Sequence, residues 1–148
     1  MARTESISPP HGALPAGPAV ILIEPQLGEN IGMAARAMMN CGLMDMRLVN
    51  PRDEWPNRYA DAAASGATAI IDGARVYDTT NAAIADLQMV YATTARSRDM
   101  TTEVVTPFEA VVRMKKDERG GVRSGVMFGK EAKGLTNDDV ALANAILT

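Results

Sequence analysis

One short run of apolar residues constrains the fold of this chain more than any other feature. Residues 19–23 read Ala-Val-Ile-Leu-Ile, so a strand built from them would be apolar on both of its alternating faces. Such a strand needs cover on both sides, which is typical of a parallel sheet with helices above and below it. The run therefore predicts a buried strand in an α/β domain.

The rest of the chain continues this pattern, because short apolar segments alternate with segments of helical character. The expected strands, each bounded by turn residues, are 19–23, 46–49, 75–77, 89–92, 124–128 and 145–147. The expected helices begin near Asn30, Ala60, Thr79 or Thr80, Pro107, and Thr136 or Asn137. Residues 69–71 are consistent with a strand, a helix or a loop. This alternation predicts an α/β fold with a mostly parallel sheet and helices on both faces.

The length and composition are those of one globular domain. The chain has 148 residues, of which 47% are hydrophobic and 22% are charged, and this suits a sizeable core. Residues 1–18 contain four prolines and two glycines, which disfavour both helix and strand. We therefore expect a disordered tail over residues 1–18 and one domain over residues 19–148.

Other features of the sequence disfavour whole classes of protein. No apolar run approaches the roughly 20 residues needed to span a bilayer, and no basic-then-apolar signal region opens the chain. We therefore expect a cytoplasmic protein that does not bind membranes. Cys41 and His11 are the single residues of their types, so we expect neither a disulfide nor a Cys/His metal site.

The net charge of −3 argues against a strongly basic protein that binds nucleic acid without specificity. It does not exclude an enzyme that docks RNA on a local basic patch. Two groups of arginines lie close together in the sequence, namely Arg36, Arg47, Arg52 and Arg58, and the pair Arg96 and Arg98. Charge alone is equally consistent with arginines scattered over the surface.

The loops that follow the strands carry the candidate chemistry, because open α/β sheets bind ligands beyond the carboxyl ends of their strands. These loops are 24–30, 50–58, 93–102 and 129–135. Common signatures are absent from the sequence, including G-x-G-x-x-G after the first strand, a Walker loop, G-x-S-x-G and H-E-x-x-H. Dinucleotide-binding, kinase and hydrolase functions are therefore disfavoured.

A distinctive helical segment follows the first loop, reading Asn30-Ile31-Gly32-Met33-Ala34-Ala35-Arg36-Ala37, with Gly42 after it. From the residues alone, it is an amphipathic helix capped by Asn30 and carrying a solvated arginine. Together with Leu48-Val49-Asn50-Pro51, this stretch resembles the first motif of the SPOUT class of RNA 2′-O-methyltransferases. Residues 93–98, Thr-Thr-Ala-Arg-Ser-Arg, resemble a loop of one branch of that class, and residues 126–137 resemble its second motif.

These three matches agree in order and spacing and cover residues 19–148. The branch that they resemble most is the tRNA (cytidine/uridine-2′-O)-methyltransferase of the J type, which modifies nucleotide 32 in the anticodon loop. The resemblance therefore implies S-adenosyl-L-methionine as cofactor and RNA as partner, with tRNA favoured over rRNA. Relatives are homodimers, so a homodimer is expected as well.

The resemblance also marks individual residues. Arg36 matches the arginine proposed to activate the ribose hydroxyl, Asn30 helps to shape that site, and Glu131 lies near the reaction centre. The residues expected to bind the cofactor are Thr93, Thr94, Ala95, Gly129 and Leu135. The residues expected to contact RNA are Arg52, Arg96 and Arg98.

Arg36 poses a chemical difficulty, because a guanidinium has a reference pKa above 12 and is a poor general base at neutral pH. We therefore expect Arg36 to stabilise the developing alkoxide and a nearby phosphate, while another base or water accepts the proton.

The third motif of the class, an Asn-Pro stretch followed by Ser-Leu-Asn, would begin just after Thr148. The resemblance thus indicates a domain that is incomplete at its C-terminal side. In relatives this segment threads a trefoil knot, which we expect here only if the chain continues past Thr148. Two alternatives remain open, a catalytically inert RNA-binding or interaction domain that keeps the fold and, less favoured, a nucleotide-binding module acting on small molecules.

Overall fold

The computed structural model describes residues 17–94 and 102–148. In these residues the strands are β1 (Ala19–Ile23), β2 (Met46–Val49), β3 (Arg75–Tyr77), β4 (Met89–Thr93), β5 (Glu103–Val105), β6 (Ser124–Phe128) and β7 (Ala145–Leu147). The helices are α1 (Gly28–Asn40), α2 (Arg58–Ala64), α3 (Thr68–Asp72), α4 (Thr80–Ile84), α5 (Pro107–Arg119) and α6 (Asn137–Ala141), with a 3-10 turn at Ser65–Ala67.

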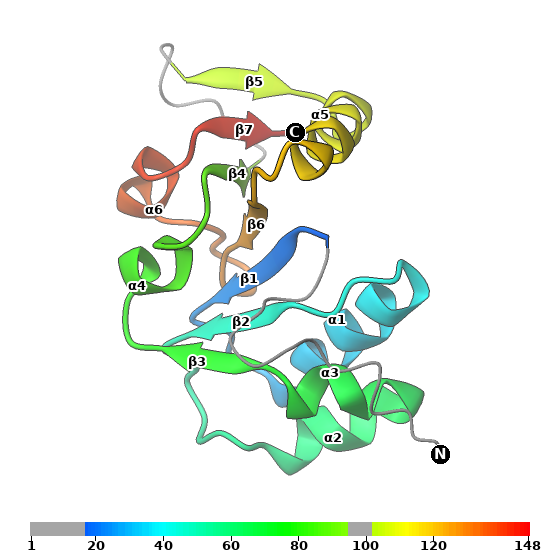
Figure 1. Ribbon diagram of the computed structural model, residues 1–148. Helices are drawn as coiled ribbons and strands as arrows, with labels where there is room; N and C mark the ends of the chain where they lie inside the picture. The colour runs from blue at the N-terminus through cyan, green and yellow to red at the C-terminus, as the bar shows by residue number, and fades with distance from the viewer. Residues whose placement is uncertain (1–16, 95–101) are drawn as a thin grey trace.

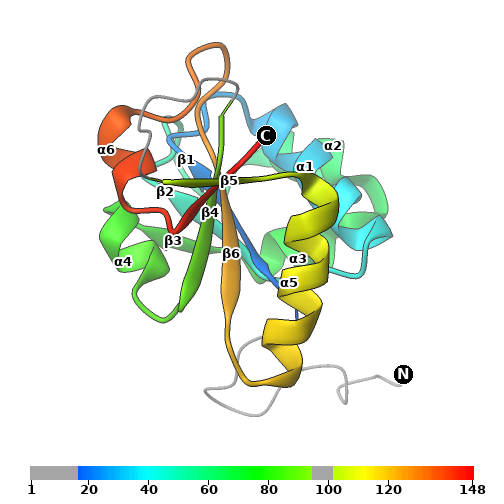
Figure 2. The same cartoon turned by 90° about the horizontal axis from the view of Figure 1, so that it is seen from above.

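The strands form one sheet in the order β3-β2-β1-β6-β4-β7-β5, and every pairing is parallel. The first predicted strand, β1, lies inside the sheet between β2 and β6, with Val20 opposite both Met46 and Val126. Its double-sided apolar pattern is explained by this position, because helices cover both faces of the sheet (Figures 1 and 2). The predicted α/β fold with a parallel sheet is confirmed.

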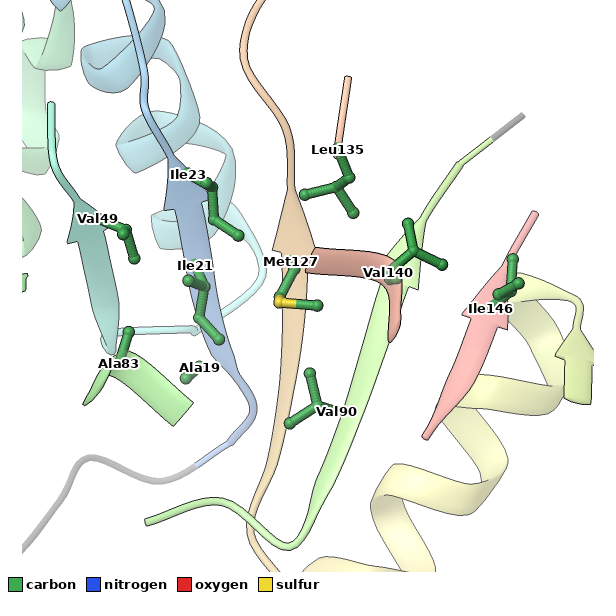
Figure 3. Close-up of a cluster of buried hydrophobic side chains, with 11 residues drawn as sticks. Ala19, Ile21, Ile23, Val49, Ala83, Val90, Met127, Leu135, Val140 and Ile146 are labelled. Atoms are coloured by element: carbon green, nitrogen blue, oxygen red, sulfur yellow. The ribbon is translucent and has the colours of Figure 1, made fainter. Parts of the chain in front are cut away.

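Three buried clusters hold the layers together. On one face, Ile21 and Met127 pack with Ala83 of α4 and Val140 of α6 (Figure 3). On the other face, α1, α2 and α3 bury a second cluster against β1 and β2, and α5 buries a third against β4, β6 and β7. The carboxyl ends of the central strands are thereby held at one edge of a rigid sheet.

Local sequence accounts for most helix starts. Thr79 accepts a hydrogen bond from Ala82 N at the start of α4, and Thr136 accepts one from Asp139 N at the start of α6. Thr106 and Glu109 form a reciprocal capping box at the start of α5. The predicted starts of these three helices are confirmed, because polar caps are local signals that need no tertiary partner.

The start of α1 corrects the sequence prediction. Asn30 was expected to cap this helix, but α1 begins at Gly28, and its N-cap residue Leu27 makes no side-chain cap hydrogen bond. Asn30 lies inside the first turn, and its side chain donates to a residue of a distant loop, Glu131. A long-range contact has replaced the local one, and sequence periodicity cannot show such a contact.

Two further elements differ from the pattern of the sequence. The strand β5 was not predicted, because its three residues Glu-Val-Val carry no alternation, and its pairing partner β7 lies 40 residues further along the chain. The ambiguous segment 69–71 is helical, within α3, where Ile70 and Ile71 are buried. The predicted tail over residues 1–18 lies outside the described residues except for Gly17 and Pro18.

Candidate active site

The candidate site lies where the loops after β1 and β6 meet, at the carboxyl ends of two neighbouring strands. The loop after β6 folds back on itself, because Gly134 N donates to Lys130 O at 2.9 Å. A Cβ on Gly129 would lie only 2.0 Å from Gly134 C and 2.2 Å from Leu135 N. Only glycine fits at position 129, because the main chain of Gly134 and Leu135 packs where any other residue would place its Cβ.

Glu131 joins the two loops. Its carboxylate accepts hydrogen bonds from Gln26 N at 2.9 Å, Leu27 N at 3.2 Å and Asn30 Nδ2 at 2.9 Å. Partial burial raises the pKa of the Glu131 carboxyl, but the hydrogen bonds from Asn30 and from main-chain amides outweigh burial and hold that pKa below its ordinary value. Glu131 is therefore an ionised acceptor with three partners, which suits positioning better than proton transfer.

A small cavity of about 130 Å³ opens beside this junction. Its lining residues come from β1, α1 and the two loops, and they are Leu22, Pro25, Asn30, Ile31, Ala34, Gly129 and Glu131. The cavity thus brings together three residues that were predicted separately from two motifs, namely Asn30, Gly129 and Glu131.

A second pair reinforces the same junction. Lys130 Nζ lies 3.4 Å from Glu24 Oε1, and both side chains are partly exposed. The backbone of Glu24 has φ 51°, a left-handed conformation that turns the chain sharply after β1. Sequence reasoning missed Glu24 and Lys130 as site residues, although each directly follows a predicted strand or a site glycine.

The predicted cofactor residues after β4 extend this edge by one strand. Thr93 Oγ1 donates to Met127 O at 2.8 Å, and Thr94 N donates to Leu147 O at 3.4 Å. The two threonines therefore tie β4 to its neighbours β6 and β7. Ala95, together with Arg96 and Arg98, lies outside the described residues.

The side chain and the main chain of Leu135 lie in different surroundings. Its side chain is 7% exposed and points into the core beside Met127 and Val140 (Figure 3). Its main chain lies against Gly129 at the site. Any contact of Leu135 with a cofactor would therefore use the main chain, and its role as a cofactor residue stays a prediction.

Arg36 and Arg52, two arginines predicted to belong to the site, lie at different places relative to the cavity. Arg36 is exposed on α1, and six residues of helix turn it about 240° around the axis from Asn30, away from the cavity. Arg52 lies beside the site, because its main-chain N donates to Pro25 O at 3.0 Å, and its guanidinium pairs with Asp53. The roles of Arg36 and Arg52 stay predictions.

Arg47 corrects the idea of a continuous arginine patch. Its side chain is fully buried and pairs with Asp45 at 2.9 Å and with Asp86 at 2.5 Å. Asp45 also pairs with Arg75 and Arg123. Arg47 therefore belongs to an internal ion network and cannot contact RNA.

Two further chemistries are not supported in residues 17–94 and 102–148. These residues contain no group of three or more His, Cys, Asp or Glu side chains placed to hold a metal ion. The helices in the same residues are all too short or too polar to cross a membrane.

Comparison with known proteins places this geometry in a family. The family model described as the SpoU rRNA methylase family matches residues 17–148. The uncharacterized tRNA/rRNA methyltransferase LasT of Escherichia coli K12 is 35% identical over 133 residues, which cover 86% of this chain and 55% of LasT. The tRNA (cytidine/uridine/adenosine-2′-O-)-methyltransferase TrmJ of Pseudomonas aeruginosa is 38% identical over 121 residues, covering 82% of this chain and 47% of the relative.

Solved structures agree with this assignment. TrmJ from Z. mobilis ZM4 is 53% identical with a TM-score of 0.85, and the match covers 90% of this chain and 58% of that one. AviRb from Streptomyces viridochromogenes, crystallised with AdoMet, is 14% identical with a TM-score of 0.63, covering 92% of this chain and 49% of AviRb, and shows a shared fold only. The chain spans about half the length of the relatives that it matches.

Proposed function

Because this chain belongs to the SpoU rRNA methylase family, we propose that it transfers a methyl group from S-adenosyl-L-methionine to a ribose 2′-hydroxyl of RNA. The observation that carries the proposal is the cavity where Asn30, Gly129 and Glu131 meet at the carboxyl ends of β1 and β6. Open parallel sheets bind their ligands at this edge.

The residues at this edge fit a cofactor that is held largely by main chain. Gly129 leaves main-chain groups rather than a side chain at the end of β6, and Thr93 and Thr94 continue the edge to β4. We expect these residues, with Ala95 and the main chain of Leu135, to hold S-adenosyl-L-methionine. When bound, the cofactor supplies a methyl group activated by its sulfonium.

The chain's own residues then orient the ribose and stabilise charge. Asn30 and Glu131 fix the loop after β1 against the loop after β6, which sets the shape of the cavity. Because Arg36 points away from the cavity of its own chain, we expect it to act at the cavity of a second copy in a homodimer. There it stabilises the developing alkoxide and a neighbouring phosphate, and water or another base accepts the proton. Alignment of the ribose oxygen with the methyl group supplies much of the rate.

The proposed substrate is a pyrimidine nucleotide in the tRNA anticodon loop, at position 32. Support comes from the names of relatives, which include tRNA (cytidine/uridine-2′-O-)-methyltransferases from Yersinia enterocolitica and Salmonella typhimurium. Arg52 beside the cavity, with Arg96 and Arg98, would contact the RNA. We also propose that the protein is a cytoplasmic homodimer. A monomer in sedimentation equilibrium at micromolar concentration would contradict the homodimer.

Methyl transfer from radiolabelled S-adenosyl-L-methionine onto unmodified tRNA transcripts tests the proposal. We expect one labelled 2′-O-methyl pyrimidine, mapped by nuclease digestion and mass spectrometry, and no transfer to a transcript with a 2′-deoxy target. Binding of RNA without binding of S-adenosyl-L-methionine in calorimetry would instead support the alternative of an inert RNA-binding domain.

Replacement of Arg36 separates catalysis from cofactor binding. We expect Arg36→Ala to lower turnover by about 10²–10³-fold, the range for loss of one donor that stabilises transition-state charge, while the affinity for S-adenosyl-L-methionine stays within twofold. Met33→Ala, which truncates another exposed side chain of α1, is the matched control and should retain activity. Equal losses of turnover and of cofactor affinity in Arg36→Ala would contradict this role.

A further inference from the structure

The outward face of α5 exposes a cluster of large apolar side chains. Phe108 is 78% exposed, and Val111 and Val112, one turn further along, are 48% and 52% exposed. The opposite side of the helix packs on the sheet through Ala110, which is 1% exposed, and Met114. These exposed apolar residues therefore do not contribute to the core.

The same face of the helix continues into basic residues. Lys115 and Arg119 follow Phe108 by seven and eleven residues, so they lie within about 20° of it around the helix axis, and both are exposed. Asp117 lies on the opposite side of the helix from Phe108, whereas Glu118 lies about 20° from Val111 and accepts a hydrogen bond from Gly17 N. We define the α5 face as Phe108, Val111, Val112, Lys115 and Arg119; it places two cations in line with an aromatic ring, with the Glu118 carboxylate at its border.

Phe108 is held rigidly at the same edge of the sheet as the candidate site. Pro107 is the first helical residue, and the capping box of Thr106 and Glu109 fixes the first turn of α5. The strand that leads into this turn, β5, ends at Val105, which lies beside β7 at the carboxyl edge. The helix α5 therefore begins at the end of the sheet where the substrate would bind and runs away from it along the sheet (Figure 2).

We propose that the α5 face binds single-stranded RNA, with Phe108 stacking on an unpaired base and Lys115 and Arg119 contacting phosphates. This inference rests on the proposed RNA substrate and adds a second contact region outside the cavity. An exposed aromatic ring followed by cations along one line is the combination that single-stranded RNA requires. Protein–protein interfaces are also enriched in phenylalanine and arginine but depleted of lysine, so it is Lys115 that favours RNA over a protein partner here.

The length of the face fits this partner. At about 1.5 Å per residue, Phe108 and Arg119 are separated by about 17 Å along the helix axis. A stacked base at one end and phosphates further along can therefore belong to one short single-stranded segment. Arg113 does not belong to this line, because it lies about 140° from Phe108 around the helix axis and pairs with Glu103 of β5.

Conservative variants of Phe108 test stacking separately from apolar contact. We expect Phe108→Leu to weaken binding of a fluorescein-labelled unmodified tRNA transcript about tenfold in fluorescence anisotropy, and Phe108→Tyr to bind within twofold of the wild type. Leucine keeps the apolar surface but loses the aromatic face. Val76→Ala, at the opposite edge of the sheet, is the control and should leave binding unchanged.

The salt dependence of binding tests the phosphate contacts. The double variant Lys115→Gln/Arg119→Gln removes both cations. Each phosphate contact to a single strand contributes about 0.7 to the slope of log K against log salt concentration, so this slope should become shallower by about 1.4. An unchanged slope would contradict the contacts that we assign to Lys115 and Arg119.

Calorimetric titration with S-adenosyl-L-methionine separates this inference from the proposed function. We expect every α5 variant to bind the cofactor as the wild type does. Cofactor binding with equal RNA affinity in wild type and Phe108→Leu overturns the α5 inference alone. Cofactor binding with no RNA binding by the wild type overturns the α5 inference and also counts against the proposed RNA substrate. Dissociation of an oligomer by Phe108→Ala with unchanged RNA affinity also overturns it, since the face would then be a protein contact. Failure of the wild type to bind S-adenosyl-L-methionine would instead count against the proposed function.

Discussion

Glu131 illustrates how hydrogen-bonding partners decide what a carboxylate can do. Two main-chain amides and the Asn30 amide group occupy its oxygens, and they come from the loop and helix that open the site. A carboxylate so engaged stabilises a fixed arrangement of loops, because each donor would otherwise lose a charge-assisted hydrogen bond.

Replacement of Glu131 by glutamine should therefore loosen the site. Glutamine keeps one acceptor oxygen and puts an NH₂ group in place of the other, facing either Gln26 N or both Leu27 N and Asn30 Nδ2. At least one donor then loses its acceptor, so we expect Glu131→Gln to lower the free energy of unfolding by about 1–3 kcal/mol and to weaken cofactor binding. Urea denaturation and calorimetry measure the two effects. Glu24→Gln, which changes a partly exposed carboxylate of the same junction, is the control and should cost less than about 1 kcal/mol.

The same residue predicts a dependence on pH. The pKa of Glu131 is lower in the folded chain than its ordinary value, so its stabilisation is present above the unfolded pKa, about 4.3, and is lost as pH falls through the folded pKa. The difference in stability between wild type and Glu131→Gln should thus shrink below about pH 4.3. A difference that stays constant between pH 3 and pH 7 would contradict the assignment.

At this scale, the sequence predicted several candidate site residues but not the contacts between them. Asn30 and Glu131 were both predicted at the site, yet their mutual hydrogen bond joins residues 101 positions apart, and no local pattern encodes it. Arg47 shows the reverse failure. Its place near other arginines in the sequence indicated a surface patch, whereas its position in β2 buries it against two aspartates.

Among the elements, the loop after β6 depends on one glycine. A Cβ on Gly129 would overlap main-chain atoms of Gly134 and Leu135, which cannot rotate away as a side chain can. We expect Gly129→Ala to displace the loop, to abolish measurable cofactor binding and to cost about 1–3 kcal/mol of stability, read by calorimetry and thermal unfolding. Gly66→Ala, where a Cβ meets open space, should leave cofactor binding intact, and equal losses in both variants would show general unfolding instead.

Elements defined by their own residues could be predicted, and elements defined by partners could not. The strand β1 is a continuous apolar run, β2 and β6 are short, mostly apolar segments beside turn residues, and capping residues identify the starts of α4, α5 and α6. The strand β5 exists because β7 offers it a pairing edge. The start of α1 is set by packing, since a Cβ on Gly28 would lie 2.4 Å from Asn57 Oδ1.

Across the whole molecule, the carboxyl ends and the amino ends of the strands have different roles. The candidate site occupies the carboxyl edge, whereas the ion network of Asp45, Arg47, Asp86, Arg75 and Arg123 lies at the amino ends of β2, β3, β4 and β6. Arg47 also donates to Ala83 O at 2.7 Å, which attaches α4 to the sheet. The network therefore fixes the strands relative to one another at the end of the sheet opposite the candidate site.

This separation predicts that stability and ligand binding can be altered independently. Arg47→Met removes the buried cation, so Asp86 loses its pair with Arg47 and Asp45 keeps only Arg75 and Arg123. We expect the free energy of unfolding, measured by urea denaturation, to fall by about 3–5 kcal/mol. The control Arg113→Met breaks the exposed pair with Glu103 and should cost less than about 1 kcal/mol. Because the network lies at the far edge, the fraction of Arg47→Met that remains folded should bind S-adenosyl-L-methionine with wild-type affinity. A weakened affinity in that folded fraction would show instead that the network at the amino edge also sets the geometry of the cavity, through the strands β2 and β6 that run between the two edges.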